Sequence, residues 1–211
     1  RENSIIYNVD FENGQKTGFF LDQRFNRREV AFLSKGKRVL DCCTHTGSFA
    51  LNAAMGGAEK VTAMDISNDA LTTAKENAFI NGFEKKIEFV QADVFDYLPQ
   101  VESLKPAPYD FIILDPPAFT KSRKTALDAV RGYTEINSRA MKALPRGGYL
   151  ATCSCSHFME EKMFVKMLKN ASEYAGVSLR LIKACAQSPD HPELMSVPET
   201  KYLKFYLLQI T

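Results

Sequence analysis

The spacing of apolar residues changes repeatedly along the chain from residue 37 onward, and each change predicts a new element. Short apolar runs rich in β-branched and aromatic residues predict strands, whereas apolar residues three and four positions apart predict helices. Glycines separate several of these segments, as is typical of helix ends. The expected strands are 38–42, 60–64, 87–91, 111–114, 148–155, 179–186 and 202–210, and the expected helices are 22–33, 48–55, 68–81, 126–143 and 160–174.

Strands that alternate with helices indicate a parallel sheet covered on both faces. We therefore expect an α/β protein with a Rossmann-like, doubly wound and mainly parallel sheet of seven strands. Ligands of such sheets bind at the carboxyl ends of the strands, near the point where the strand order reverses. The loops that follow the strands are therefore the places where chemistry is expected.

The N-terminal segment has a different pattern. Residues 4–20 place apolar runs on both sides of Asn13-Gly14, and this dipeptide between apolar runs is a strong hairpin signal. We expect residues 1–35 to form a β-hairpin and a helix that pack on a catalytic core of residues 36–211.

Composition narrows the class of protein. The 211 residues are 45% hydrophobic and 25% charged, as is usual for one globular domain, and no apolar run approaches the roughly 18 residues that span a bilayer. The absence of such a run predicts that the protein has no membrane partner. Five cysteines without a zinc-type spacing predict reduced thiols in the cytoplasm and no bound metal. The net charge of +2 does not indicate nucleic-acid binding, and clusters such as Arg27-Arg28 are interpreted as solvated surface. Because the chain starts at Arg1, we expect an upstream domain.

The loop after the first strand of the α/β repeat contains one glycine, in Thr46-Gly47-Ser48. A dinucleotide site needs several glycines, because backbone must approach a pyrophosphate, so we expect a ligand without phosphates. Asp65 ends the next strand, where it can accept hydrogen bonds from both ribose hydroxyls. Asp93 ends the third strand and would bind the exocyclic amine of adenine; capping a helix is its alternative role.

Neighbours of these two acids complete the expected adenosine site. Ile66 and Val94 would enclose the adenine ring, and Ser67 follows Ile66 directly. The order of these elements favours an adenosine ligand over a nicotinamide dinucleotide.

The chain at this point resembles the class I S-adenosylmethionine-dependent methyltransferases. It is most similar to the ribosomal large-subunit RNA cytosine-5 methyltransferase family, over nearly its whole length. The resemblance implies S-adenosyl-L-methionine as cofactor, ribosomal RNA as partner and an RNA-binding PUA domain upstream of this catalytic domain. The motifs that carry it are Gly18-Phe19-Phe20-Leu21-Asp22-Gln23-Arg24, Thr46-Gly47-Ser48-Phe49, Asp115-Pro116-Pro117, Arg131-Gly132-Tyr133, Ser154-Cys155-Ser156 and Asp190-His191-Pro192.

Methylation at carbon 5 of cytosine needs a cysteine, because this carbon becomes nucleophilic only after a thiolate adds to carbon 6. Cys153 and Cys155 end the fifth strand and share a face if the strand is regular. Cys155 lies nearer the loop, and the resemblance selects it as the nucleophile because it occupies the cysteine of the Ser-Cys-Ser motif. Cys153, Cys42, Cys43 and Cys185 are interpreted as buried structural thiols.

Asp115-Pro116-Pro117 closes the fourth strand, and its prolines stiffen the loop. Asp115 is the candidate for contacting nitrogen 3 and the amine of the target base, and we also count it among the cofactor-binding residues. Pro116 and Pro117 would border the RNA.

Basic and aromatic residues supply further candidates. Lys121, Arg123 and Lys124 follow the candidate site and would neutralise RNA phosphates. Tyr133 either stacks on a flipped base or packs in the core. Arg24 either pairs with the cofactor carboxylate or forms a surface salt bridge.

Two other functions stay open. A ribosomal RNA guanine methyltransferase, acting at N2 or N7, would share the fold without covalent catalysis and without the Ser-Cys-Ser cysteine. A non-catalytic RNA-binding module would have no need for the acids and the cysteine together.

Overall fold

A computed structural model describes residues 1–12, 18–119 and 126–211 of the chain. Within these ranges, seven strands form one sheet in the order β3-β2-β1-β4-β5-β7-β6. The strands are β1 (Arg38–Cys42), β2 (Lys60–Asp65), β3 (Ile87–Gln91), β4 (Phe111–Leu114), β5 (Tyr149–Ser154), β6 (Leu179–Cys185) and β7 (Lys204–Ile210). The helices are η1 (Leu21–Gln23), α1 (Arg24–Leu33), α2 (Ser48–Met55), α3 (Asn68–Ile80), α4 (Val94–Ser103), α5 (Ala126–Ala143), α6 (Glu161–Ala175) and η3 (Pro198–Thr200).

The sheet confirms the expected fold class. Strands β1 to β5 run parallel, and β7 runs antiparallel to both β5 and β6. The reversal at β7 is possible because no helix crosses the sheet between β6 and β7, and antiparallel neighbours need no crossover. All seven expected strands are present, with ends within two residues of those predicted.

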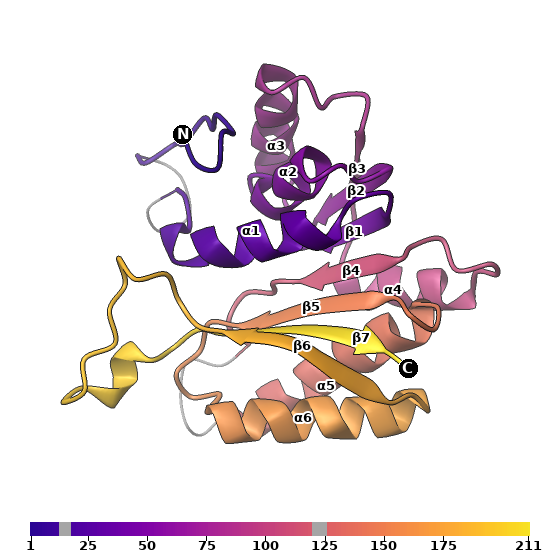
Figure 1. Ribbon diagram of the computed structural model, residues 1–211, viewed down its shortest axis with the longest axis vertical. Coiled ribbons are helices and arrows are strands. Elements are labelled where there is room, and N and C mark those ends of the chain that lie inside the picture. The colour runs from indigo at the N-terminus through magenta and orange to yellow at the C-terminus, as the bar shows by residue number, and fades with distance from the viewer. Residues whose placement is uncertain (13–17, 120–125) are drawn as a thin grey trace.

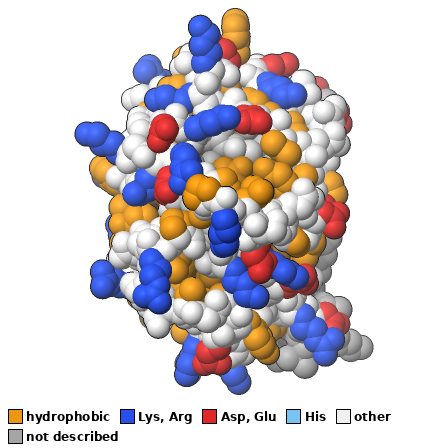
Figure 2. Space-filling view, turned by 90° about the vertical axis from the view of Figure 1, so that its right-hand side faces the viewer, with side chains coloured by type: hydrophobic (Ala, Val, Ile, Leu, Met, Phe, Trp, Pro, Cys, Tyr) orange, Lys and Arg blue, Asp and Glu red, His pale blue; other side chains and the backbone are white. Residues whose placement is uncertain are grey.

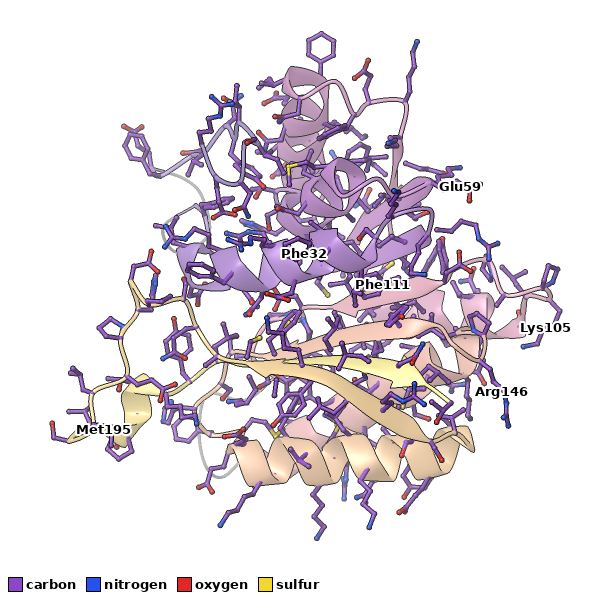
Figure 3. All side chains as sticks on the ribbon, viewed as in Figure 1. Phe32, Glu59, Lys105, Phe111, Arg146 and Met195 are labelled. Atoms are coloured by element: carbon purple, nitrogen blue, oxygen red, sulfur yellow. The ribbon has the colours of Figure 1, made fainter. Side chains whose placement is uncertain are left out.

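Successive residues of the central strands enter two different cores. Leu40 and Ile112 face a core shared with α4, α5 and α6. Val39 and Phe111 face the opposite core, which α1, α2 and α3 cover, and Figure 3 shows Phe111 between the sheet and α1. Burial on both faces explains why these strands are continuously apolar. Figure 1 shows the resulting layers, with α1 to α3 on one side of the sheet and α5 and α6 on the other.

Helix α4 is the element that the apolar spacing did not predict. It contains Pro99, which is unfavourable inside a helix, and this residue obscures the helical pattern. Asp93 is its N-cap, since its Oδ1 accepts a hydrogen bond from the Phe95 amide at 2.8 Å. The capping role that was the alternative for Asp93 is therefore present in the fold.

The expected N-terminal hairpin is wrong as to its strands, because residues 6–12 and 18–20 form none, although Gly18 lies directly against the Asp10 carbonyl. The Ile6 amide donates to the side-chain oxygen of Asn81 at 2.9 Å, and the Asn81 amide donates back to the Ile6 carbonyl at 2.7 Å. The Asn8 amide donates to Asn77 at 2.6 Å. The N-terminal segment thus uses the side chains of α3 as partners. The turn at residues 13–14 lies outside the described residues.

Arg27 also differs from its predicted surface position, because it is 1% exposed. Its Nε and Nη2 donate to the two carboxylate oxygens of Glu2, at 2.6 Å each, and its Nη1 donates to the Phe20 carbonyl at 2.9 Å. The guanidinium also lies 4.7 Å from the centre of the Phe19 ring. A bidentate pair of this kind compensates the burial of both charges. It ties the N-terminal segment to α1.

The strand order reverses between β1 and β4, where Cys42 pairs in register with Leu114. The residues that follow these two strands therefore lie side by side at the edge where ligands bind in doubly wound sheets. In Figure 1 the segment between β6 and β7 projects from this side of the molecule, and Figure 3 places Met195 near its tip.

The opposite side carries side chains of both charges mixed with hydrophobic ones (Figure 2). Among the described residues, no helix is long and apolar enough to cross a membrane.

Candidate active site

Asp41 lies inside β1 and is completely buried. Its Oδ2 accepts hydrogen bonds from the Thr44 hydroxyl at 2.5 Å and from the Ala50 amide at 2.9 Å. Its Oδ1 has no hydrogen-bond partner among the described residues. Burial raises the pKa of this carboxyl to about 7, and the negative charges of Asp115 and Asp65 add to the shift. Sequence reasoning missed Asp41 as a site residue, although an acid within an apolar strand was the available signal.

Gly47 is the N-cap of α2 and has a φ of +81°, which favours glycine. A Cβ atom here would lie 3.1 Å from the Cβ of Ala74 on α3. Gly47 therefore lets the loop pack closely against α3. The sequence had suggested that this glycine lets the backbone approach a ligand. Thr46 is buried beside it, and its hydroxyl oxygen has no partner among the described residues. Ser48 begins the helix.

Asp65 ends β2 and is held by two backbone amides. Its Oδ2 accepts from His45 at 2.8 Å, and its Oδ1 accepts from Ser67 at 3.0 Å. The Ser67 hydroxyl caps α3 by accepting from the Ala70 amide. Ile66 is 66% exposed, so an apolar side chain stands open beside the acid. Each carboxylate oxygen retains a lone pair for a further donor.

Four carboxylates act electrostatically on the half-buried thiol of Cys43. Burial raises the pKa of this thiol, and the charges of the surrounding acids raise it further. These acids, in decreasing order of effect, are Asp65, Asp115, Asp41 and Asp93. The strand ends therefore form a single acidic site, as the topology predicts. Such a site suits a ligand with hydroxyl, amine and positively charged groups.

Asp115 follows β4 and is half-buried. Its Oδ1 accepts from the side-chain amide of Gln23 at 3.1 Å, and it also bonds to the Cys153 thiol. Burial and the negative charge of Asp22 raise the pKa of Asp115 to about 6. The hydrogen bonds from Cys153 and Gln23 and the positive charge of Arg27 lower this pKa and so oppose the shift. This carboxyl can therefore carry and donate a proton close to neutral pH.

The segment around η1 reaches both loops of the site. The Phe20 ring packs against His45 of the first loop, with centroids 5.1 Å apart. Gln23 contacts the fourth loop through Asp115, and its side-chain oxygen accepts from Asn26 at 2.6 Å. Gln23 belongs to the Gly18–Arg24 motif, but sequence reasoning assigned it no role, because its partner lies 92 residues away.

The two cysteines at the end of β5 occupy different environments. Cys153 is completely buried, and burial raises the pKa of its thiol strongly, as expected for a structural cysteine. Cys155 follows the last residue of β5 and is half-buried, so reagents can reach it from the loop. Cys42 is buried as expected, whereas Cys43 and Cys185 are only half-buried.

Lys204, the first residue of β7, is a buried cation near this cysteine. Its Nζ donates to the carbonyls of Ser156 at 2.5 Å and Tyr202 at 2.7 Å. Burial lowers the pKa of Lys204 to about 8, whereas the negative form of Cys155 acts in the opposite direction. Sequence reasoning missed this residue because it starts an otherwise apolar strand.

Arg24 and Tyr133 make the contacts that were the alternatives to their predicted roles. Arg24 forms a surface salt bridge of 3.5 Å with Asp190, and both side chains are 38% exposed. Tyr133 is completely buried, packs against the Phe119 ring, and its hydroxyl accepts from Ser154 at 3.2 Å. The structure therefore favours core packing for Tyr133 and a salt bridge for Arg24.

The predicted RNA-facing residues are only partly described. Pro116 is buried and Pro117 is exposed beside Asp115. Val94 is 8% exposed at the start of α4. Lys121, Arg123 and Lys124 lie outside the described residues.

Comparison with known proteins gives three findings about sequence. The profile of the family described as S-adenosylmethionine-dependent methyltransferase matches residues 1–206. The chain is 42% identical over 204 residues to ribosomal RNA large subunit methyltransferase I of Aeromonas salmonicida, which is 96% of this chain and 51% of that protein. It is 40% identical over 212 residues to the protein of the same name from Vibrio vulnificus, covering 99% and 53%. The chain thus spans about half the length of the curated relatives it matches.

Solved structures show the same fold. SMU.776, assigned as a methyltransferase and solved with SAH, superposes with a TM-score of 0.87 and 26% identity over 99% of this chain and 54% of that one. Trm5b from Pyrococcus abyssi superposes with a TM-score of 0.72 at 17% identity, covering 100% of this chain and 55% of that one, and shows the fold alone.

Proposed function

Because the chain belongs to the S-adenosylmethionine-dependent methyltransferase family, we propose that it methylates carbon 5 of a cytosine in large-subunit ribosomal RNA through a covalent adduct of Cys155. The observation that carries this proposal is the pairing of an accessible cysteine with a protonatable acid at adjacent strand ends. Asp115 bonds to the thiol of Cys153, and Cys155 is two residues further along the same chain segment. The ribosomal RNA substrate is suggested by the curated relatives.

The residues of the acidic site fit the cofactor of this family. Asp41 Oδ1 and Thr46 Oγ1 are buried oxygens without a partner among the described residues, and a ligand that donates hydrogen bonds would satisfy them. We propose that the strand ends hold S-adenosyl-L-methionine, which supplies an electrophilic methyl group when bound. The contacting residues would be Asp41, Thr46, Gly47, Ser48, Asp65, Ile66, Ser67, Asp93 and Val94, with Asp115 bordering the same space.

Cys155 and Asp115 would act together on the base. The Cys155 thiolate adds to carbon 6 of cytosine, and the ring electrons move toward carbon 5 as Asp115 donates a proton to nitrogen 3. Carbon 5 is then nucleophilic enough to accept a methyl group. A water molecule then accepts the carbon 5 proton, and the electrons of that C–H bond restore the ring double bond and expel the Cys155 thiolate. Nitrogen 3 returns its proton to Asp115.

The RNA side of the site rests on the sequence alone. Lys121, Arg123 and Lys124 are proposed to contact phosphates, which would make binding weaker as salt rises. Pro116 and Pro117 would border the extruded base. Arg24, which is 38% exposed, would exchange Asp190 for the carboxylate of the cofactor, whereas the burial of Tyr133 gives that residue no role in this proposal.

RNA that contains 5-fluorocytosine tests the covalent step. Fluorine cannot leave as a proton does, so the adduct with Cys155 should persist through denaturing electrophoresis. We expect this band for the wild type and for Cys185→Ala, which removes another half-buried thiol. Cys155→Ala should give no band and should lower methyl transfer by about 10⁴-fold or more. Wild-type protein that methylates guanine and forms no adduct would contradict the proposal.

A further inference from the structure

Lys204 is buried in a way that the proposed methyl transfer does not by itself explain. It pairs with Ser154 in the register of β5 and β7, and it is 4% exposed. Its two described hydrogen bonds go to neutral carbonyls, those of Ser156 and Tyr202. An ammonium group has three donors, and its burial is costly unless a negative charge lies nearby.

The charges around Lys204 identify Cys155 as the strongest counter-charge. The negative form of Cys155 stabilises the ammonium most, and Glu161 of α6 follows, whereas Lys201 opposes it. Glu161 already accepts from the Tyr206 hydroxyl at 3.0 Å and pairs with Lys201 at 3.2 Å. Its charge is therefore shared among other partners, while Cys155 is adjacent to Ser156, whose carbonyl Lys204 holds.

We propose that Lys204 is a positioning residue for Cys155: it holds the Ser156 carbonyl, and its buried ammonium favours the thiolate of the neighbouring cysteine. This role rests on the proposed function of Cys155 as nucleophile. Below about pH 8 Lys204 keeps its three protons and the thiol proton passes to solvent, so no other reactant is needed. The thiolate is the reactive form of cysteine, and a nearby lysine favours it.

The test is the pH dependence of Cys155 alkylation by iodoacetamide, followed by mass spectrometry of its peptide in the full chain without RNA. In Lys204→Met, the midpoint should rise by about one pH unit, because a nearby opposite charge is lost. Lys204→Arg keeps the charge and should restore most of the shift. Lys201→Met removes an exposed charge close by, and its midpoint should stay near that of the wild type.

Other titratable groups face this pair, and their contributions are the same in the wild type, Lys204→Met and Lys204→Arg. They are Cys153 on β5, Tyr133 on α5, Glu161 on α6, and Lys201 and Tyr202 before β7. An unchanged midpoint in folded Lys204→Met would overturn the proposal.

A second measurement applies if Lys204→Met does not fold. Coupling between two sites is reciprocal, so Cys155→Ser should lower the pKa of Lys204, measured by the pH dependence of acetic anhydride labelling. An unchanged labelling profile would overturn the proposal. The 5-fluorocytosine adduct separates the role of Lys204 from the proposed function. If the adduct forms but neither the alkylation midpoint nor the pKa of Lys204 shifts, only the role of Lys204 is wrong. If these values shift but no adduct forms, only the proposed function is wrong.

Discussion

The two halves of the site are built by different kinds of contact. On the side of β1, β2 and β3, each acid is held by groups of its own loop or of the neighbouring one, as Asp65 is by the amides of His45 and Ser67. On the side of β4, β5 and β7, side chains from distant segments make the contacts, as Gln23 does with Asp115. The first half is therefore a local property of strand ends, whereas the second depends on the docking of the N-terminal and C-terminal segments.

This difference predicts separable defects. Changes on the side of β4 and β5 should lower the rate of methyl transfer and leave cofactor affinity nearly intact. Changes on the side of β1 and β2 should weaken cofactor binding or alter stability.

Asp115→Asn should have the largest effect, a loss of about 10²- to 10⁴-fold in methyl transfer, because the proton donor is removed. In the wild type the protonated form of Asp115 is lost as pH rises through about 6. Single-turnover rates should therefore show a falling limb near that pH, which the Asn variant lacks. Cofactor affinity measured by calorimetry serves as the control. An Asn variant with the full rate would contradict the role of Asp115.

Arg27→Met should destabilise the fold by about 3–5 kcal/mol, because it leaves the Glu2 carboxylate buried without its partner. Chemical denaturation measures this change. The matched control is Lys60→Met, which breaks an exposed pair with Glu88 and should leave the denaturation midpoint close to that of the wild type. Where the Arg27 variant remains folded, methyl transfer should fall more than cofactor affinity. Equal losses in both would weaken the distinction between the two halves.

Asp41→Asn tests the buried acid of the cofactor half through pH. The pKa of Asp41 is about 7 in the folded protein, against an ordinary value of 3.8. The free energy of unfolding therefore falls as pH rises from about 4 to 7, and the loss is complete above about pH 7. Relative to the wild type, the Asn variant should gain about 2–3 kcal/mol of unfolding free energy between pH 5 and pH 8. Parallel pH profiles for the two proteins would show that Asp41 ionises at its ordinary pKa.

Gly47→Ala should have the smallest effect, about 1–2 kcal/mol, from its left-handed backbone. Crowding against Ala74 should add to this cost and weaken cofactor binding. Gly82→Ala is the matched control, because Gly82 has a φ of +71° and nothing lies within 4 Å of an added Cβ. Equal thermal stability of the two variants would show that the contact with Ala74 contributes nothing.

The same contrast explains what the sequence could predict. The strand ends and the acids Asp65 and Asp93 follow from local patterns, because each acid comes directly after an apolar strand. Gln23 and Lys204 could not be found in this way, since their partners lie 92 and 48 residues away. Arg27 looked like surface for the same reason, because its partner Glu2 belongs to a segment whose docking no periodicity shows.

Release of tritium from RNA labelled at carbon 5 of cytosine would show whether that carbon is the methylated atom. Large-subunit ribosomal RNA lacking the modification would be incubated with S-adenosyl-L-methionine and the wild-type chain. One tritium should be released for each methyl group incorporated, and Cys155→Ala should release none. Methyl incorporation without tritium release, with the methyl group recovered on guanine, would contradict the proposed reaction.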